Sequence, residues 1–309
     1  MEQQVPGIRD ESAARRESIS LEEWQQGGKW FFYEGHAIFS RMGGQGEPLV
    51  LIHGFPTASW DWNRIWPMLV QNNKLLVADL LGFGFSDKPR EHAYSIADQA
   101  DLVEGLLEGL GLEAVHLLAH DYGCSVAQEL LAREQEGVLP FQIASVCFLN
   151  GALFPEVHNP LMIQKLLRSP MGGLLSRALT RRSFERSFLK LFGSKNLPDQ
   201  QDLDDFWHLL TYNNGRGILH HLIQFMEERR CHRHRWVSAL QNARQPMRLI
   251  SGTADPVSGA AMAQRYQELI PEADVVQLRN VGHYPHFESP WEVYGAYREF
   301  RKRHSDPEH

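Results

Sequence analysis

The stretch of residues 114–132, AVHLLAHDYGCSVAQELLA, places an aspartate where a carboxylate can act as a nucleophile. An apolar run ends at His120, Asp121 follows, and the next residues have one apolar face at helical spacing. Asp121 is therefore predicted at the tip of a sharp strand-to-helix turn, flanked by the small residues Ala119 and Gly123. A carboxylate is ionised at neutral pH and suits attack on a saturated, electrophilic carbon. The alternative interpretation is that Asp121 only caps the helix.

Two residues further along the chain complete a set that could do this chemistry. Asp255 follows the apolar run 247–250, and His283 follows the run 275–278. Each is predicted on a loop just past a strand, and the carboxyl ends of parallel strands meet at one edge of a sheet. His283, oriented by Asp255, would deprotonate a water that attacks the ester formed on Asp121. These partners favour the catalytic interpretation of Asp121.

Backbone N–H groups are expected to receive the oxyanion of that second step. The predicted strand 48–52 runs into the turn His53-Gly54-Phe55-Pro56. The N–H groups of Phe55 and Tyr122 would then form an oxyanion hole. The mechanism needs water as a cosubstrate and neither a metal nor an organic cofactor.

Other groupings of reactive residues are weaker. Ser125 and Cys124 would lie inside the predicted helix, with no strand ending before them. The pair Gly82-x-Gly84 has Asp87 where a dinucleotide site needs its third glycine. The basic run 229–235, which includes Cys231 and two histidines, lacks a second ligand group with zinc-finger spacing. We interpret that run as a solvated helix end.

The elements that position these residues alternate along the chain. Short apolar runs are predicted strands, and helical patterns fall between most of them: 48–52, 75–78, 115–119, 143–149, 247–250 and 275–278. This predicts an α/β protein with a mainly parallel sheet and helices on both faces. The alternation stops after Leu149, and residues 151–243 contain helical patterns at 161–168, 202–211 and 217–230 without a convincing strand. Such a block, inserted between two strands, is expected to form a helical cap over the strand ends.

Composition excludes several other classes of protein. The 309 residues are 43% hydrophobic and 22% charged, which is typical of a globular chain. The formal charge of −7 disfavours nucleic acid as a partner. No apolar run reaches the roughly 20 residues that span a bilayer, and the first 20 residues lack the apolar core of a secretory signal. Three cysteines suggest a reducing compartment, so cytoplasm is the expected location. The sequence does not indicate an oligomeric state.

At these motifs the chain resembles the α/β-hydrolase superfamily, in the branch of epoxide hydrolases and haloalkane dehalogenases that use an aspartate nucleophile. Within that branch it is most similar to the mesoderm-specific transcript proteins, and the likeness covers about residues 30–300. The stretches that carry it are HGFPTASWDW at 53–62, DLLGFGFSDKPR at 79–90, YSIADQA at 94–100 and LLAHDYGCSVAQELL at 117–131. The motif order predicts an α/β-hydrolase core at 30–150 and 244–303 with a cap at 151–243, and the polar composition of residues 1–20 predicts a mobile tail.

The leaving group would distinguish the two activities, and here the chain departs from both families. Epoxide hydrolases usually hold the ring oxygen with two cap tyrosines, whereas Tyr212 is the single tyrosine between 151 and 243. His158 and His220 are further candidates for the acid. Haloalkane dehalogenases typically place Trp after the nucleophile, where this chain has Tyr122, so Trp207 would have to hold the halide.

The expected function is therefore a cofactor-independent hydrolase, with epoxide opening ranked above dehalogenation. An ester hydrolase and a non-catalytic small-molecule binder on the same fold are the remaining alternatives. The complete set of Asp121, Asp255 and His283 argues against the binder, because pure binding does not need all three at their strand ends.

Overall fold

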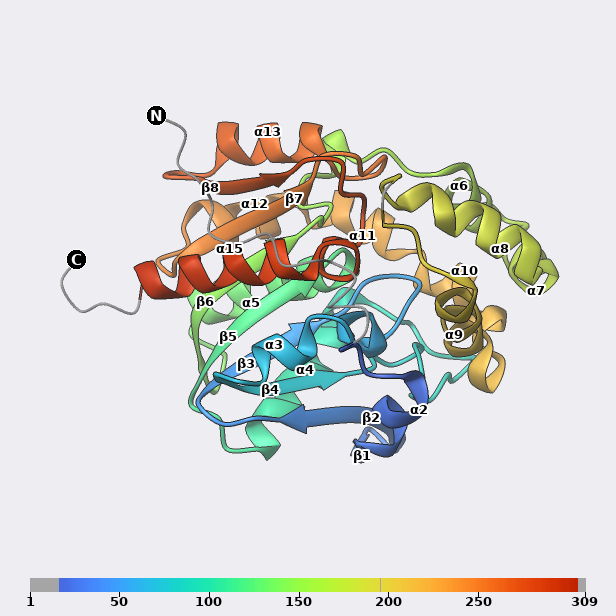
Figure 1. Ribbon diagram of the computed structural model, residues 1–309, viewed down its shortest axis with the longest axis horizontal. Helices are drawn as coiled ribbons and strands as arrows, with labels where there is room; N and C mark the ends of the chain where they lie inside the picture. The colour runs from blue at the N-terminus through green and yellow to red at the C-terminus, as the bar shows by residue number, and fades with distance from the viewer. Residues whose placement is uncertain (1–16, 195, 305–309) are drawn as a thin grey trace.

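An eight-stranded sheet forms the centre of the computed structural model, which describes residues 17–194 and 196–304 (Figure 1). The strand order is β1-β2-β4-β3-β5-β6-β7-β8, and all pairs from β4 to β8 are parallel. The strands are β1 (Gly28–Tyr33), β2 (His36–Gly43), β3 (Glu47–Ile52), β4 (Asn73–Ala78), β5 (Ala114–His120), β6 (Gln142–Leu149), β7 (Met247–Gly252) and β8 (Asp274–Leu278). The predicted α/β-hydrolase fold with a mainly parallel sheet is confirmed.

The parallel strands were predictable because helices cover both of their faces. Leu49–Ile52 of β3 and Leu117–His120 of β5 are buried without interruption, so their sequences are continuous apolar runs. β1 and β2 instead form an antiparallel hairpin that pairs with β4 at the sheet edge. Exposed positions interrupt this hairpin, with Phe32 75% exposed. The hairpin therefore has no uninterrupted buried run, and none of the predicted strands corresponds to it.

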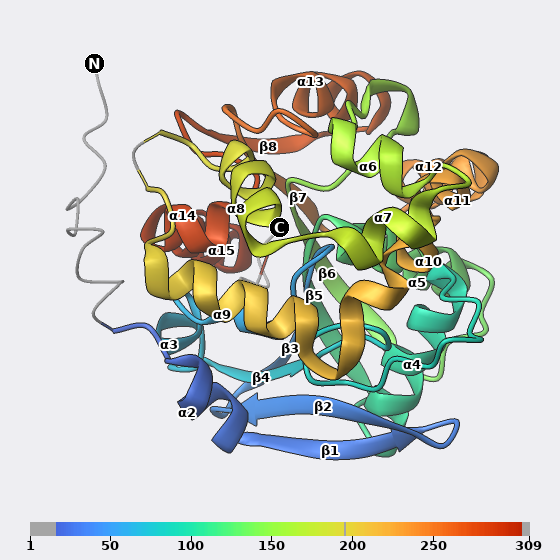
Figure 2. The same ribbon diagram turned by 90° about the vertical axis from the view of Figure 1, so that its right-hand side faces the viewer.

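Helices lie on two sides of the sheet, as Figures 1 and 2 show from perpendicular directions. One side carries α3 (Trp66–Leu69), α14 (Pro285–Glu288) and α15 (Pro290–Arg303), and the other carries α4 (Ile96–Gly109), α5 (Tyr122–Gln135) and α12 (Arg233–Gln241). α13 (Ala260–Leu269) packs beside β7 and β8, and the short α2 (Leu21–Gln26) precedes β1. Because the strands from β4 to β8 run in the same direction, the loops after β5, β7 and β8 reach the same edge.

A helical insert connects β6 to β7 and lies over that edge of the sheet (Figure 2). Its helices are α6 (Met162–Leu167), α7 (Gly172–Ala178), α8 (Arg181–Phe188), α9 (Gln200–Thr211), α10 (Leu219–Leu222) and α11 (Phe225–Cys231). The helix predicted at 217–230 is broken into α10 and α11. Neither α7 nor α8 corresponds to a predicted helix. α7 begins with Gly172 and Gly173, and glycine disfavours a helix.

Two contacts lie near the boundaries expected for the cap at 151–243 and for the tail at 1–20. α12 lies within the range 151–243, yet it packs on the core helix α5, where the Trp236 indole N–H donates to Glu129 at 2.8 Å. The part of the insert that covers the strand ends therefore finishes with α11. Of the tail expected at 1–20, residues 1–16 lie outside the described part. Ser20 caps α2 by accepting a hydrogen bond from the Glu23 N–H. Among the described residues, no helix is long and apolar enough to cross a membrane.

Candidate active site

Asp121 lies in the turn between β5 and α5, with a backbone conformation that side chains rarely adopt. Its φ is 42° and its ψ is −103°, which projects the residue out of the line of both elements. Gly123 makes this turn possible, because a Cβ there would lie 2.4 Å from the Ile52 carbonyl oxygen. The Gly123 N–H donates to the His53 carbonyl at 3.0 Å. The strand-to-helix turn thus has the geometry of a nucleophile elbow.

The three residues predicted to act together meet at the end of the sheet. His283 Nδ1 is 2.8 Å from Asp255 Oδ2, and His283 Nε2 is 4.0 Å from Asp121 Oδ2. Asp255 is fixed by hydrogen bonds from the Asn150 amide at 2.7 Å and the Ser258 hydroxyl at 2.8 Å. All three members are almost fully buried, so their charges interact strongly.

Burial and charge act in opposite directions on the protonation of this group. Burial alone would raise the pKa of Asp255, but the His283 charge and several hydrogen bonds lower it to about 2. Burial alone would lower the pKa of His283, but Asp255 and then Asp121 raise it to about 9. For Asp121, Arg229 and His283 outweigh burial, and the pKa is lowered. In the free protein, Asp121 is an ionised carboxylate beside a protonated imidazole.

Of the two residues predicted for the oxyanion hole, Phe55 contacts the Asp121 carboxylate and Tyr122 follows Asp121 in the chain. The Phe55 N–H donates to Asp121 Oδ2 at 3.1 Å. Tyr122 is the first residue of α5, directly after Asp121. Its ring is buried against Phe83 and Phe225, with ring centroids 5.4 Å and 5.0 Å away. The Tyr122 side chain therefore has a packing role.

Arg229, on α11, contacts Asp121, and sequence reasoning missed it. The side chain is 2% exposed, and its Nη2 lies 2.9 Å from the Asp121 carbonyl oxygen and 3.4 Å from Asp121 Oδ1. Its Nε donates to the Ser125 hydroxyl at 2.7 Å. The interpretation of 229–235 as a solvated helix end is wrong for Arg229. Helical spacing from the buried Phe225 and Met226 could have indicated an inward-facing position.

A cavity of about 60 Å³ lies beside His283, and most of the side chains that line it are apolar. The core contributes Phe55, Pro56 and His283. The insert contributes Leu161, Ile163, Gln164, Leu167, Leu179, Phe184, Ser187, Phe188, Leu191, Leu210 and Leu219. This site fits a small molecule with a sizeable hydrocarbon part.

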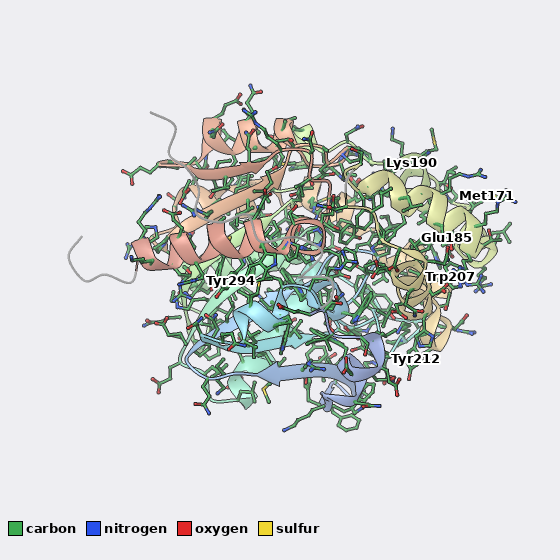
Figure 3. All side chains as sticks on the ribbon, viewed as in Figure 1. Met171, Glu185, Lys190, Trp207, Tyr212 and Tyr294 are labelled. Atoms are coloured by element: carbon green, nitrogen blue, oxygen red, sulfur yellow. The ribbon has the colours of Figure 1, made fainter. Side chains whose placement is uncertain are left out.

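None of the four residues expected to hold the leaving group is among the residues that line this cavity. Tyr212 packs on Phe85 with ring centroids 5.1 Å apart, and Trp207 packs on Phe184 at 5.6 Å. Figure 3 shows Tyr212 and Trp207 on the insert. His220 contacts the start of α7 at Gly173. Their expected roles are not supported by these positions.

His158, the fourth of these residues, is largely buried after β6, close enough to Arg229 and Asp121 for their charges to affect its titration. Burial, followed by the charge of Arg229, lowers the pKa of His158 to about 3. His158 is therefore neutral at pH 7, and a neutral imidazole still carries one N–H that can donate.

A second cluster of buried polar side chains lies next to the loop that carries His283. Asp61, His120 and His286 each offer one ligand atom, and these atoms lie within 4.8 Å of one another. His120 Nε2 is 2.8 Å from the His283 carbonyl oxygen. This group supports the loop that carries His283.

Glu288 holds the same loop from its other end. Its carboxylate accepts hydrogen bonds from the N–H groups of Gly193 at 2.7 Å, Gly282 at 2.8 Å and Tyr284 at 3.1 Å. Burial raises its pKa to about 7. One carboxylate thereby joins the His283 loop to the insert residue Gly193.

The Glu288→Gln variant is expected to lower the free energy of unfolding by about 1–3 kcal/mol. An amide has one oxygen, so at least one of the three buried N–H groups would face an NH₂ group instead of an acceptor. Urea unfolding of the two proteins measures the difference. The matched control is Glu268→Gln, a surface carboxylate paired with Arg265, which should leave stability unchanged. Equal midpoints for Glu288→Gln and wild type would contradict this role.

Comparisons with known proteins agree with this architecture. Residues 47–290 match the family model of the alpha/beta hydrolase fold. The chain is 41% identical over 297 residues to the mesoderm-specific transcript protein of Mus musculus, covering 92% of this chain and 88% of that protein. The solved structure of the epoxide hydrolase CorEH superposes with a TM-score of 0.75 at 19% identity, covering 89% of this chain and 98% of that one.

The haloalkane dehalogenase DbeA from Bradyrhizobium elkani superposes equally well, with a TM-score of 0.75 at 20% identity, covering 89% and 99% of the two chains. At these identities the two structures share the fold with this chain and do not distinguish between their activities. The match to the family model and the likeness to the mouse protein both extend through the core and the insert. The chain therefore belongs to the α/β-hydrolase fold family.

Proposed function

We propose that this protein is a hydrolase whose Asp121 attacks a saturated carbon of an apolar substrate and forms an ester that water then cleaves. The reaction proposed first is the opening of an epoxide. The observation that carries the proposal is the position of the Asp121 carboxylate, 3.1 Å from the Phe55 N–H and 4.0 Å from His283 Nε2.

In the first step, a carboxylate oxygen of Asp121 bonds to the carbon while the bond from that carbon to its leaving oxygen breaks. No base is required, because the carboxylate is already ionised. The helical insert acts as a cap whose apolar side chains hold the hydrocarbon part of the substrate. The alkoxide takes its proton from solvent, and the N–H of the neutral His158, which lies near Asp121, is proposed to hold the alkoxide by a hydrogen bond.

In the second step, a water attacks the carbonyl carbon of the ester, and His283 accepts its proton. Esterification removes the negative charge of Asp121, one of the charges that raise the pKa of His283. The imidazolium therefore releases its proton to solvent more readily, and the neutral imidazole can act as the base, with Asp255 stabilising the imidazolium that re-forms. The Phe55 and Tyr122 N–H groups receive the oxyanion. Its collapse releases the diol and restores Asp121.

Dehalogenation by the same carboxylate is the second candidate. It is favoured by the absence of tyrosine from the residues that line the cavity, because a departing halide needs no proton. The rest of the cycle is unchanged. The substrate that forms the ester would therefore separate the two candidates.

A single turnover in H₂¹⁸O, with enzyme in excess over styrene oxide or a dibromoalkane, tests the shared mechanism. Along the ester route, the new hydroxyl of the product carries ¹⁶O from Asp121. The heavy oxygen from water stays on the Asp121 carboxylate. Mass spectrometry of the proteolytic peptide that contains Asp121 reads this label. An unlabelled peptide together with an ¹⁸O-labelled product would mean direct attack by water and would overturn the proposal.

A further inference from the structure

The outer surface of α6, α7 and α8 exposes large apolar side chains to solvent. Met162 is 69% exposed, Leu166 43%, Met171 57% and Leu174 64%. Met162 and Leu166 are one turn apart on α6, and Leu174 follows Met171 by three residues at the start of α7, so each pair shares one helix face. Contiguous exposed apolar groups of this kind mark interaction sites in many proteins.

Cations lie among these apolar side chains. Residues 161–192 contain seven lysines or arginines and one acid, Glu185, although the chain as a whole carries a formal charge of −7. The exposed members for which no ion pair is recorded in the described part of the chain are Lys165, Arg177, Arg182, Arg186 and Lys190. Figure 3 shows Met171 and Lys190 on this insert, and Figure 2 shows α6, α7 and α8 from outside.

Two of these helices, α6 and α8, also line the cavity with their inner faces, and Leu179 lines it directly after α7. Ile163 and Leu167 of α6 face it, as do Phe184 and Phe188 of α8. One thin layer of helices therefore separates the exposed apolar and basic surface from the apolar cavity. A molecule taken up at this surface would have a short path to Asp121.

We propose that the outer face of α6–α8 docks on an anionic phospholipid surface, and that apolar substrates reach the cavity from that surface. The second half of the proposal rests on the proposed function, whereas the docking does not. Short helices that present Met and Leu between lysines and arginines bind in the plane of a membrane. Their apolar side chains enter the headgroup boundary, and their cations pair with lipid phosphates.

Charge decides between a lipid surface and a second copy of this chain. A two-fold contact made by this face with itself would bring its five exposed cations against the same five cations. That arrangement is repulsive, whereas a surface of anionic phospholipid complements it.

Co-sedimentation of the full-length protein with lipid vesicles tests the docking. We expect binding to vesicles of phosphatidylcholine containing about one third phosphatidylglycerol, and much weaker binding to pure phosphatidylcholine, with affinity falling as salt rises. The double variant Arg182→Gln/Arg186→Gln should bind about fivefold more weakly for each charge removed. Met171→Ser/Leu174→Ser should lose a further apolar contribution that salt does not screen.

Matched variants lie on the opposite edge of the molecule. Phe32→Ser removes a 75% exposed aromatic from β1, and Lys29→Gln removes an exposed cation from the same strand. Both should bind vesicles like wild type. Equal binding to neutral and anionic vesicles, or equal losses in the β1 variants, would overturn the docking. A wild-type dimer that Met171→Ser/Leu174→Ser converts to monomers would assign this face to a second copy.

Ester formation with styrene oxide, measured without vesicles, separates this proposal from the chemistry. The surface variants should form the Asp121 ester at the wild-type rate, because none of the changed residues lines the cavity. Failure of wild type to form the ester, with vesicle binding intact, would refute the chemistry and leave the docking standing.

Discussion

The His283→Gln variant is expected to accumulate a covalent ester on Asp121, while its steady-state turnover falls by about three orders of magnitude. Attack by Asp121 does not use His283, because the carboxylate is already ionised. Hydrolysis of the ester does use it, because His283 is the group positioned to accept the proton of water. Glutamine keeps a polar side chain at this position but cannot act as a base. The first half of the reaction therefore proceeds and the second half stops.

Intact-mass measurement after incubation with styrene oxide, a dibromoalkane or a nitrophenyl ester reads this trap directly. The reagent that leaves an adduct identifies the class of electrophile. Peptide mapping should place the adduct on Asp121, and the double variant Asp121→Ala/His283→Gln should form none. Wild-type turnover in Asp121→Ala alone would show that another group is the nucleophile.

Most of the candidate catalytic group was predictable because each member lies in the turn or loop that follows a strand. The runs 115–119, 247–250 and 275–278 are largely apolar, each with one polar residue, and Asp121, Asp255 and His283 follow them in the chain. The parallel strands of one sheet end at the same edge. Residues that follow these strands therefore lie near one another, whatever conformation the loops adopt. The distances of 2.8 Å and 4.0 Å around His283 agree with that expectation.

The supporting residues could not be predicted in the same way, because their partners are distant in sequence. Arg229 meets Ser125 across 104 positions, and Asn150 meets Asp255 across 105. No local periodicity encodes either contact. The leaving-group candidates Tyr212 and Trp207 failed for a related reason. Their orientation depends on how α9 packs, and composition within the insert does not determine that packing.

The Arg229→Met variant is expected to lower the rate of ester formation about a hundredfold at neutral pH, with a larger loss at lower pH. The guanidinium holds the carbonyl oxygen of Asp121 at 2.9 Å and pairs with its carboxylate. Its removal frees the strained turn, and small misplacements of a reacting group cost about this factor. The rate is best measured in the His283→Gln background, where hydrolysis does not interfere.

The pH dependence separates a charge effect from a purely structural one. The Arg229 charge favours the ionised form of Asp121 and lowers its pKa, so removing that charge raises the pKa. Only the carboxylate attacks, and therefore the reactive fraction shrinks as the pH falls toward the raised pKa. Arg229→Lys keeps the charge and should keep the wild-type pH profile with a reduced rate. If Arg229 only stabilised the fold, Arg229→Met would lower the rate by one factor at every pH.

Arg233→Gln is the matched control for this variant. Arg233 begins α12, one turn beyond Arg229, and pairs with the surface residue Glu156, so its loss should change neither the rate nor the pH profile. Circular dichroism of each variant establishes that the fold is retained, which matters because Arg229→Met leaves the buried Asp121 charge without its partner. A wild-type pH profile in a folded Arg229→Met protein would show that the lowered pKa of Asp121 does not depend on the Arg229 charge.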